Sequence, residues 1–421
     1  MKILAIETSC DDTAVAALEI KEKASLSFDV LSNIVSSQAG VHKKYGGVFP
    51  AMAKREHQNN LVPVLTRALK QAKLLNPKFQ IPRLRQGFGG QANPKKIINP
   101  KFQIISTILE REQELCKKLI PFFKKYENPD VDLIAVTHGP GLEPCLWVGI
   151  NFAKAIAYFW DIPIVPVNHI ESHLLVNILE NKNIKFPAIC LVVSGGHTQL
   201  ILMKGIGKYK ILGETRDDAA GECFDKCAKI LGLGYPGGPI ISKLADRHPM
   251  SIKRLDRHRV SIKLPRPMIN TKDYDFSFSG LKTAVLYAVK ERKRVWSNSH
   301  DRRNLTTLKF KQYQQEMAVE IQQAIIDVLI KKTIKASKDY KAKTIILGGG
   351  VSANKELRLQ FESKIKNSES KINFLVPPKN LSTDNAVMTA VAGYFNRKNK
   401  IGRAVLRKLK AEANLRIHPV K

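Results

Sequence analysis

Apolar residues fall in two patterns that recur along the chain. Short apolar runs, bounded by glycine, proline or small polar residues, predict buried strands over 2–6, 131–137, 188–193 and 344–347. Apolar residues at helical spacing predict a helix over 51–73, whose buried face carries Leu61, Val64, Leu65 and Leu69. A helix is also expected over 107–127, and a longer one over 311–336. Strands that alternate with helices in this way predict an α/β fold.

Two of the predicted strands lead into small polar turns that could hold a phosphate. The strand 2–6 is followed by the turn 7–13, and the strand 188–193 is followed by 194–198, which contains two glycines. Glycine lets backbone N–H groups approach an anion closely, although such turns also occur in ordinary hairpins. A third glycine-rich turn lies at 348–354. The repeat predicts two related α/β domains with a nucleotide between them.

Two local duplications interrupt this pattern. Asn76-Pro77-Lys78-Phe79-Gln80-Ile81 recurs letter for letter at 99–104, and the pattern of 246–253 recurs at 256–263. We expect 74–104 to be an inserted surface loop, either passive or an RNA-binding arm, and 246–263 to be a loop extension rather than a metal site. The predicted boundaries are 1–165 for the first domain, completed by a helix over 384–397, and 166–383 for the second, followed by a mobile basic tail over 398–421.

Charge and cysteine content indicate the kind of partner and the cellular compartment to expect. The 69 Lys and Arg residues outnumber the 37 Asp and Glu residues by 32, which favours a polyanionic partner, with nucleic acid ahead of an anionic membrane. The six cysteines form no CxxC pair, as is typical of a reducing compartment. The first apolar stretch is too short for a signal peptide, and no run is long enough to span a membrane. A cytoplasmic protein is expected.

The segment 168–173 is a candidate metal helix. His169 and His173 stand four residues apart, so a helix would place both imidazoles on one face. The spacing alone fits a metal site and a packed histidine pair equally well. Glu171 is not in the HExxH order of metalloproteases and is expected to point off the metal face, which argues against peptide hydrolysis. Asp384 precedes the last helix, where a carboxylate is favoured.

Other catalytic signatures are missing from the sequence. There is no GxxxxGK[ST] phosphate loop and no GxSxG nucleophile elbow. Cys10 and Ser194 are nucleophiles by residue type, but neither has a paired base in view, so packing or phosphate contact is the favoured interpretation.

Ten motifs occur in order along the chain. They are IETSCDDT at 6–13, YGG at 45–47, GPGL at 139–142, NHIESH at 168–173, VSGGHT at 193–198, DDAAGE at 217–222, GYPGG at 234–238, FSFSGLK at 276–282, GGGVSAN at 348–354 and TDN at 383–385. Together they resemble the motifs of the TsaD family, the tRNA N6-adenosine threonylcarbamoyltransferases once called O-sialoglycoprotein endopeptidases. The resemblance covers residues 1 to about 397 apart from the two duplications. The chain departs from the family pattern at Asp12, where many members have Glu, and at 143–145.

The resemblance implies an actin/Hsp70/sugar-kinase-like (ASKHA) fold, with two RNase H-like lobes and the nucleotide site between them. It implies transfer of threonylcarbamoyl from threonylcarbamoyl-AMP to the N6 amine of the adenosine 3′ of the anticodon, in tRNAs that read codons beginning with A. It also implies one divalent metal per subunit, iron with zinc as the alternative, held by His169, His173 and Asp384.

The resemblance further implies substrate contacts and partners. Besides tRNA and threonylcarbamoyl-AMP, the expected partners are a paralogous inactive subunit (TsaB-like) and a P-loop ATPase (TsaE-like). The rival functions are a metal-dependent glycoprotease, a kinase or ATP-driven chaperone of the same fold, and an ATP-binding scaffold of a tRNA-modification complex. The substrate-binding positions carried over are Val192, Val193, Ser194, Gly195, Gly196, Asp225, Gly238 and Asn354.

Overall fold

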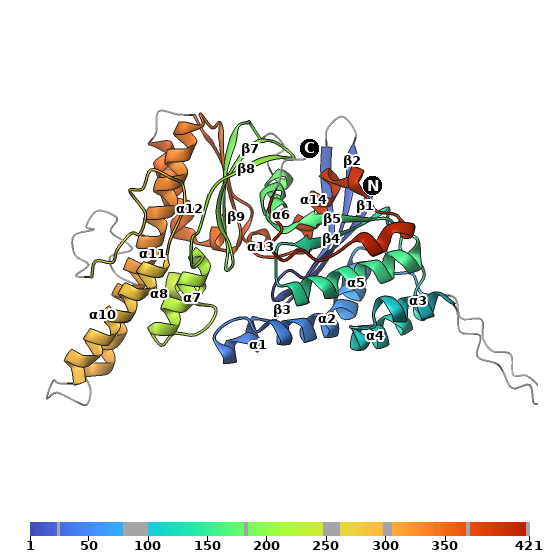
Figure 1. Cartoon of the computed structure of the whole chain (residues 1–421), viewed down its shortest axis with the longest axis horizontal. Coiled ribbons are helices and arrows are strands. Elements are labelled where there is room, and N and C mark those ends of the chain that lie inside the picture. Colours follow the sequence, from blue (N-terminus) through green and yellow to red (C-terminus); the bar gives the residue numbers. More distant parts are fainter. Residues whose placement is uncertain are drawn as a thin grey trace, which may run out of the picture. The chain divides into compact units, whose positions relative to one another are not determined.

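The computed structural model describes residues 1–22, 26–78, 100–180, 184–246, 262–297, 305–367 and 371–417. The chain forms two compact units (Figure 1). The first unit contains 1–38, 50–172 and 385–415, and the second contains 39–49, 173–384 and the residues from Arg416 onward. Each unit has its own five-stranded sheet and its own hydrophobic core.

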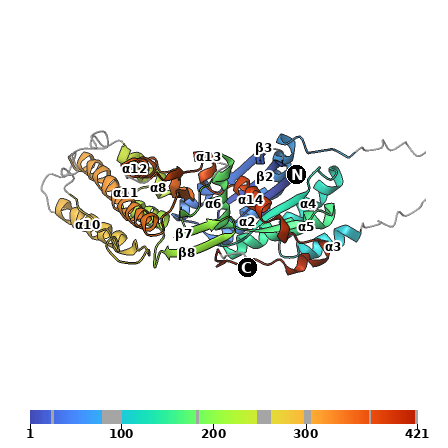
Figure 2. The same cartoon turned by 90° about the horizontal axis from the view of Figure 1, so that it is seen from above.

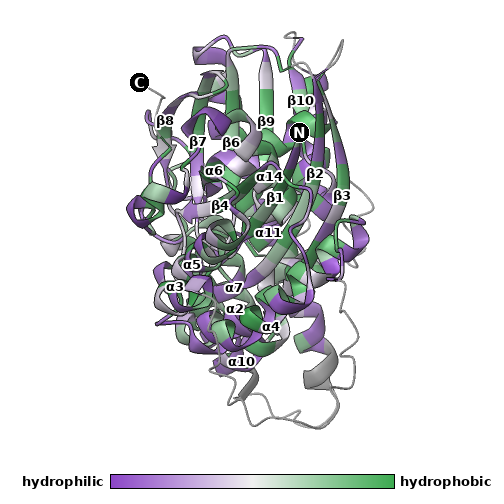
Figure 3. Ribbon diagram, turned by 90° about the vertical axis from the view of Figure 1, so that its right-hand side faces the viewer, coloured by the Kyte–Doolittle hydropathy of each residue, from purple (hydrophilic) through white to green (hydrophobic). Residues whose placement is uncertain are grey.

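The sheet of the first unit is mixed. β1 is its central strand; it pairs antiparallel with β2 and parallel with β4, while β3 and β5 form the edges. The inner strands are buried on both faces and are therefore apolar almost throughout, whereas the edge strand β3 is partly exposed and coloured in a mixture of purple and green in Figure 3. In spatial order the strands are β3 (Leu26–Ser37), β2 (Asp12–Glu22), β1 (Lys2–Glu7), β4 (Leu133–Gly139) and β5 (Ile164–Asn168).

Helices pack on both faces of this sheet, and these helices differ in the size of the residues that contact it. Leu4 and Ile6 of β1 share a core with α2 (Pro50–Gln71) and α5 (Glu143–Trp160), and the predicted stripe of α2 is buried there. The small-residue helix α14 (Ala386–Phe395) packs closely on the sheet, since a Cβ at Gly393 would lie 2.6 Å from Ala135 Cβ. The remaining helices of the unit include α3 (Pro100–Ile108) and α4 (Gln113–Lys125).

The second unit repeats the strand order and the strand directions of the first. Its central strand β6 pairs antiparallel with β7 and parallel with β9. Across the sheet the strands are β8 (Lys208–Glu214), β7 (Thr198–Gly205), β6 (Ala188–Val193), β9 (Thr344–Gly348) and β10 (Asn373–Leu375). Two mixed sheets with helices confirm the predicted α/β class.

Helices of the second unit pack on its sheet and on one another. Figure 2 shows α10 and α11 lying side by side. The helix α11 was expected over 311–336 and extends further at both ends. The main helices are α7 (Ala220–Ile230), α8 (Gly237–Asp246), α10 (Ser279–Ser297), α11 (Leu305–Asp339) and α12 (Lys355–Lys366); a short α1 (Ala39–His42) and α13 (Lys379–Ser382) complete the unit. Among the helices of the described ranges, none is both long and apolar enough to cross a bilayer.

Three local expectations need correction. The expected loop 74–104 is wrong for its last five residues, because α3 begins at Pro100; residues 79–99 lie outside the described ranges. The single helix expected over 107–127 is interrupted between α3 and α4. The C-terminal tail, expected to be mobile, packs on the first unit: Ile401 bridges to Ile164 of β5, and Leu406 and Leu409 are buried in its core. Most of the second duplication, 247–261, is also outside the described ranges.

The close packing of α14 gives a test of the fold. Replacing Gly393 by Val should lower the free energy of unfolding by about 1–3 kcal/mol, because the added atoms meet Ala135 and Val165 in a filled core. Gly402→Val is the matched control, since no atom lies within 4 Å of a Cβ at this exposed position. Thermal and urea unfolding would measure both, and equal midpoints for the two variants would contradict the packing described.

Candidate metal centre

The predicted histidine helix is present as α6 (His169–Leu175). It begins directly after β5 because the Asn168 side chain caps it: its Oδ1 accepts hydrogen bonds from the backbone N–H of Ile170 (2.9 Å) and of Glu171 (3.2 Å). His169 and His173 are both buried, with exposed fractions of 5% and 1%. The helix therefore fixes two imidazoles one turn apart on one face.

Asp384 joins the two histidines at the start of α14. It immediately precedes Asn385, whose Oδ1 caps that helix by accepting from Met388 N at 3.1 Å. Asp384 Oδ1 lies 3.2 Å from His173 Nε2, and the ligand atoms of His169, His173 and Asp384 all lie within 4.8 Å of one another. Among the described residues this is the one such group of three. Two ligands about 2.1 Å from one metal stand roughly 3 to 3.5 Å apart, and the 3.2 Å between Asp384 and His173 matches this spacing. The residue types and their proximity make the group a candidate metal site.

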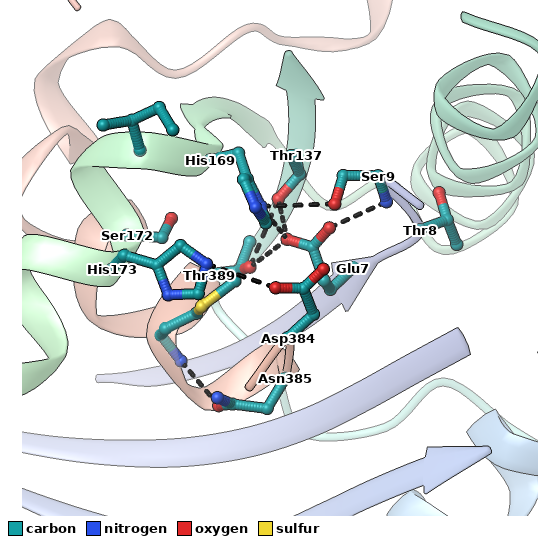
Figure 4. A network of polar contacts seen from close by, with 12 residues as sticks. Glu7, Thr8, Ser9, Thr137, His169, Ser172, His173, Asp384, Asn385 and Thr389 are labelled. Atoms are coloured by element: carbon teal, nitrogen blue, oxygen red, sulfur yellow. Dashed lines mark hydrogen bonds and ion pairs between the residues drawn. The ribbon is translucent and has the colours of Figure 1, made fainter. Parts of the chain in front are cut away.

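A fully buried carboxylate, Glu7, stands behind His169 (Figure 4). Its Oε1 accepts a hydrogen bond from Ser9 N (2.8 Å), and its Oε2 accepts from Thr137 Oγ1 (2.5 Å) and Thr389 Oγ1 (3.1 Å). We call Glu7, Ser9, Thr137, Thr389 and His169 the Glu7 network. Burial of a carboxylate is costly unless such donors surround it.

The Glu7 network surrounds Nδ1 of His169. His169 Nδ1 lies 3.2 Å from Ser9 Oγ and 3.5 Å from Glu7 Oε2. A hydrogen on Nδ1 suits the neighbouring carboxylate and leaves the lone pair on Nε2 for the metal. Sequence reasoning did not assign this role to Glu7. The available signal was a charged residue directly after the apolar run 3–6 of a strand.

The predicted substrate positions 192–196 end β6 and form the turn before β7. The side chains of Val192 and Val193 are buried, so only their backbone could meet a ligand. The turn is closed by Ser194: its N–H donates to His197 O at 2.8 Å, and its Oγ accepts from His197 N at 3.1 Å. Gly195 and Gly196 are exposed, and no atom lies within 4 Å of a Cβ placed at either. The turn therefore presents backbone rather than a reactive side chain.

Other glycines bring this turn and the metal helix together within the second unit. A Cβ at Gly221 would lie 2.6 Å from Ser194 O, and one at Gly349 would lie 2.4 Å from Val193 O. A Cβ at Gly348 would likewise lie 2.8 Å from the carbonyl oxygen of His173. Only glycine permits such backbone contacts. The structure thus places the turns at 194–196 and 348–350 beside one another and beside a predicted metal ligand.

The remaining predicted substrate residues already have structural partners. Asp225 Oδ1 accepts a hydrogen bond from Gly237 N at 2.7 Å, which holds the turn next to Gly238. Asn354 caps α12 by accepting from Leu357 N at 3.0 Å, and its Nδ2 donates to Gln322 Oε1 at 2.7 Å. Asp225 lies one turn after Gly221 on α7, and Asn354 directly follows the Gly350–Ala353 turn. Both are therefore close in sequence to the glycines that pack against Val193 and Ser194.

Similarity to solved structures is distant. Component A of (R)-2-hydroxyglutaryl-CoA dehydratase from Acidaminococcus fermentans is 10% identical with a TM-score of 0.45, and the match covers 95% of this chain and 99% of that one. YeaZ from Pseudomonas aeruginosa is 13% identical with a TM-score of 0.24, over 50% of this chain and 64% of that one.

Sequence relatives are much closer. The TsaD profile, described as tRNA N6-adenosine threonylcarbamoyltransferase, matches residues 29–79 and 115–391 and leaves 80–114 unmatched. Proteins of that name from Thermosipho melanesiensis (40% identical, 94% of each chain), Persephonella marina (39%, 99% of this chain and 96% of the relative) and Clostridioides difficile (39%, 99% and 98%) match nearly end to end. The chain therefore belongs to the TsaD family of tRNA N6-adenosine threonylcarbamoyltransferases.

Proposed function

We propose that this protein transfers threonylcarbamoyl from threonylcarbamoyl-AMP to the N6 amine of the adenosine 3′ of the anticodon, in tRNAs reading codons that begin with A. Membership of the TsaD family carries the proposal. The group of His169, His173 and Asp384 supports it, since this chain has the residues for a metal centre of the kind that the family resemblance implies.

The reaction requires positioning and charge stabilisation more than a nucleophilic side chain. The amine attacks the carbonyl carbon of a mixed anhydride; a C–N bond forms, the bond to the AMP oxygen breaks, and the amine loses a proton. A divalent metal bound by three protein ligands would supply Lewis acidity and open coordination positions for substrate oxygens. The protein's remaining task is to hold the donor in line with the amine.

The glycine turns are suited to hold the anionic end of the donor. Gly195 and Gly196 are open to solvent, and Gly349 has a φ of +83°, which side-chain-bearing residues rarely adopt. Turns of this kind direct backbone N–H groups at phosphate oxygens. Positions 192–196, Asp225, Gly238 and Asn354 form the proposed substrate site. The metal is proposed to be iron, with zinc as the alternative, because imidazole and carboxylate ligands accept both.

We also propose the finer architecture and the partners implied by the family. The repeated strand order supports an ASKHA assignment with two RNase H-like lobes and the nucleotide site that this fold carries. The proposed lobes are 1–165 with the helix 384–397, and 166–383. The proposed partners are tRNA, a TsaB-like inactive paralogue and a TsaE-like P-loop ATPase.

One contact disfavours the rival glycoprotease. A metalloprotease needs a carboxylate base aimed at the metal-bound water. Glu171, the acidic residue between the two histidines, accepts a hydrogen bond from Asn396 Nδ2 at 2.7 Å and is 7% exposed. Asn396 follows the C-terminal end of α14, whereas Asp384 precedes its N-terminal end. The Glu171 carboxylate is therefore hydrogen-bonded at the end of α14 opposite to Asp384.

The activity itself is the first prediction. Incubation of the protein with unmodified tRNA and threonylcarbamoyl-AMP should yield threonylcarbamoyladenosine, detected by mass spectrometry of the digested nucleosides. A tRNA that reads codons beginning with a base other than A should remain unmodified. Absence of product both for the isolated chain and after addition of TsaB-like and TsaE-like proteins would overturn the proposal.

The metal centre gives a second prediction. His173→Ala removes one of three ligands, so bound metal and tRNA modification should both be lost. Ser172→Ala is the matched control, because Ser172 is equally buried in α6 and its hydroxyl only donates to Asn168 O at 3.1 Å. Elemental analysis and the nucleoside assay would measure both variants. Full activity of a metal-free His173→Ala protein would exclude a catalytic metal.

Glu7 gives a third prediction. In Glu7→Gln one carboxylate oxygen becomes an NH₂ donor, which conflicts with a hydrogen on His169 Nδ1 and favours the tautomer that cannot bind metal through Nε2. Metal affinity should fall by about 10- to 100-fold in a chelator competition. Thr389→Val removes a hydrogen bond to the same oxygen without facing His169 Nδ1, so it should lower stability more than metal affinity. An unchanged affinity in Glu7→Gln would leave Glu7 a purely structural role.

A further inference from the structure

A basic C-terminal segment of the first unit is held against the protein in a way that its sequence did not predict. We infer that residues 397–410, which we call the basic strap, form a docking surface for the phosphate backbone of RNA. Identifying that RNA as the tRNA substrate rests on the proposed function. The strap contains none of the predicted metal ligands and none of the proposed substrate positions.

The charge of the basic strap stands out even in this basic chain. Seven of its fourteen residues are Lys or Arg and none is Asp or Glu, whereas the whole chain has 69 basic and 37 acidic residues in 421. One of the seven, Arg397, is half-buried and pairs with Glu22 at 3.2 Å. The six exposed ones are Lys398, Lys400, Arg403, Arg407, Lys408 and Lys410.

The backbone of the strap is fixed to the first unit. Ile401 exchanges two hydrogen bonds with Ile164 of β5, at 2.6 and 3.0 Å. The 3-10 turn Arg403–Lys408 packs against α5, and Leu406 and Leu409 are 6% and 3% exposed in the core (Figures 1 and 2, red segment). Arg403 also lies over the ring of Tyr158, 4.0 Å from its centroid. Cations on an ordered backbone lose less entropy when they bind than cations on a mobile tail would.

The continuation of the strap leads towards the Glu7 network. Glu412 N donates to His138 O at 2.8 Å, and Gly141 N donates to Ala413 O at 3.1 Å, so residues 412–413 lie on the 138–141 turn. The 138–141 turn also contacts Ser9, because a Cβ at Gly141 would lie 2.5 Å from Ser9 O. Ser9 Oγ is 3.2 Å from His169 Nδ1. This chain of contacts links the basic strap to a predicted metal ligand.

RNA explains these features better than a membrane surface. Segments that bind membranes present large apolar side chains beside their basic residues. The two leucines of the strap are instead buried in the protein. Val405, which is 39% exposed, is the large apolar side chain that the strap presents to solvent. Isolated, ordered cations match phosphates, each of which releases counterions on binding.

The test removes four charges from the strap and keeps its anchors. The strap variant carries Lys400→Gln, Arg407→Gln, Lys408→Gln and Lys410→Gln, and leaves Ile401, Arg403, Leu406 and Leu409 intact. The control variant removes four exposed charges from the second unit through Lys338→Gln, Lys364→Gln, Lys366→Gln and Lys371→Gln. Both variants of the full chain have the same net charge. The Kd for tRNA is measured by fluorescence anisotropy over a series of KCl concentrations.

The strap variant should bind tRNA more weakly than the control variant. Its slope of log Kd against log[KCl] should be shallower by about 3, because each lost phosphate contact removes roughly 0.7–0.9. At saturating tRNA its modification rate and its metal content should match those of the control. If the strap variant fails to fold, Arg407→Gln and Lys408→Gln singly should each make the slope shallower by about 0.7–0.9.

Two results would overturn the inference: equal Kd values and salt slopes for the strap and control variants, or loss of binding to anionic vesicles alone with tRNA affinity unchanged. The proposed function fails separately. If the wild-type protein modifies no tRNA and yet the strap variant loses RNA affinity selectively, the RNA surface is supported and only the proposed reaction is overturned.

Discussion

The buried carboxylate of Glu7 is the interaction on which the candidate metal centre depends. A carboxylate with no exposed surface is stable only if hydrogen-bond donors surround it. Glu7 receives them from Ser9 after β1, from Thr137 in β4 and from Thr389 in α14. The same oxygen that accepts from the two threonines lies 3.5 Å from His169 Nδ1, so one carboxylate contacts three elements and a candidate metal ligand. The packing of these elements and the environment of His169 therefore depend on the same group.

The candidate site could be predicted where its residues are close in sequence. His169 and His173 lie on one helix, and Asn168 caps that helix through contacts two and three residues away. The Glu7 network could not be predicted in this way, because Thr137 and Thr389 reach Glu7 across 130 and 382 residues. Asp384 was found through the family motif. Its sequence position, next to a helix cap, is compatible with many other roles.

Tertiary contacts also determine the local structure of the two NPKFQI copies and of the basic strap. Pro77 of the first NPKFQI copy forms a bridge with Tyr126, whereas Pro100 of the second copy begins the helix α3. The strands and long helices were predicted because their apolar patterns are buried on one or both faces. The strap was expected to be mobile because half of its residues are charged. Its few apolar residues, Ile401, Leu406 and Leu409, nevertheless suffice to dock it.

The two units share one strand arrangement and one kind of close backbone contact. In each, a glycine that follows the parallel neighbour of the central strand packs at the end of that central strand or just after it: a Cβ at Gly141 would lie 2.5 Å from Ser9 O, and one at Gly349 would lie 2.4 Å from Val193 O. The central strands differ at their last residue, which is Glu7 in β1 and Val193 in β6. A carboxylate at that position gathers donors and orients an imidazole, whereas an apolar residue leaves the following turn to act through its backbone. The repeated strand thus ends in the first unit in a carboxylate that accepts hydrogen bonds, and in the second unit in an apolar residue followed by a turn of exposed glycines.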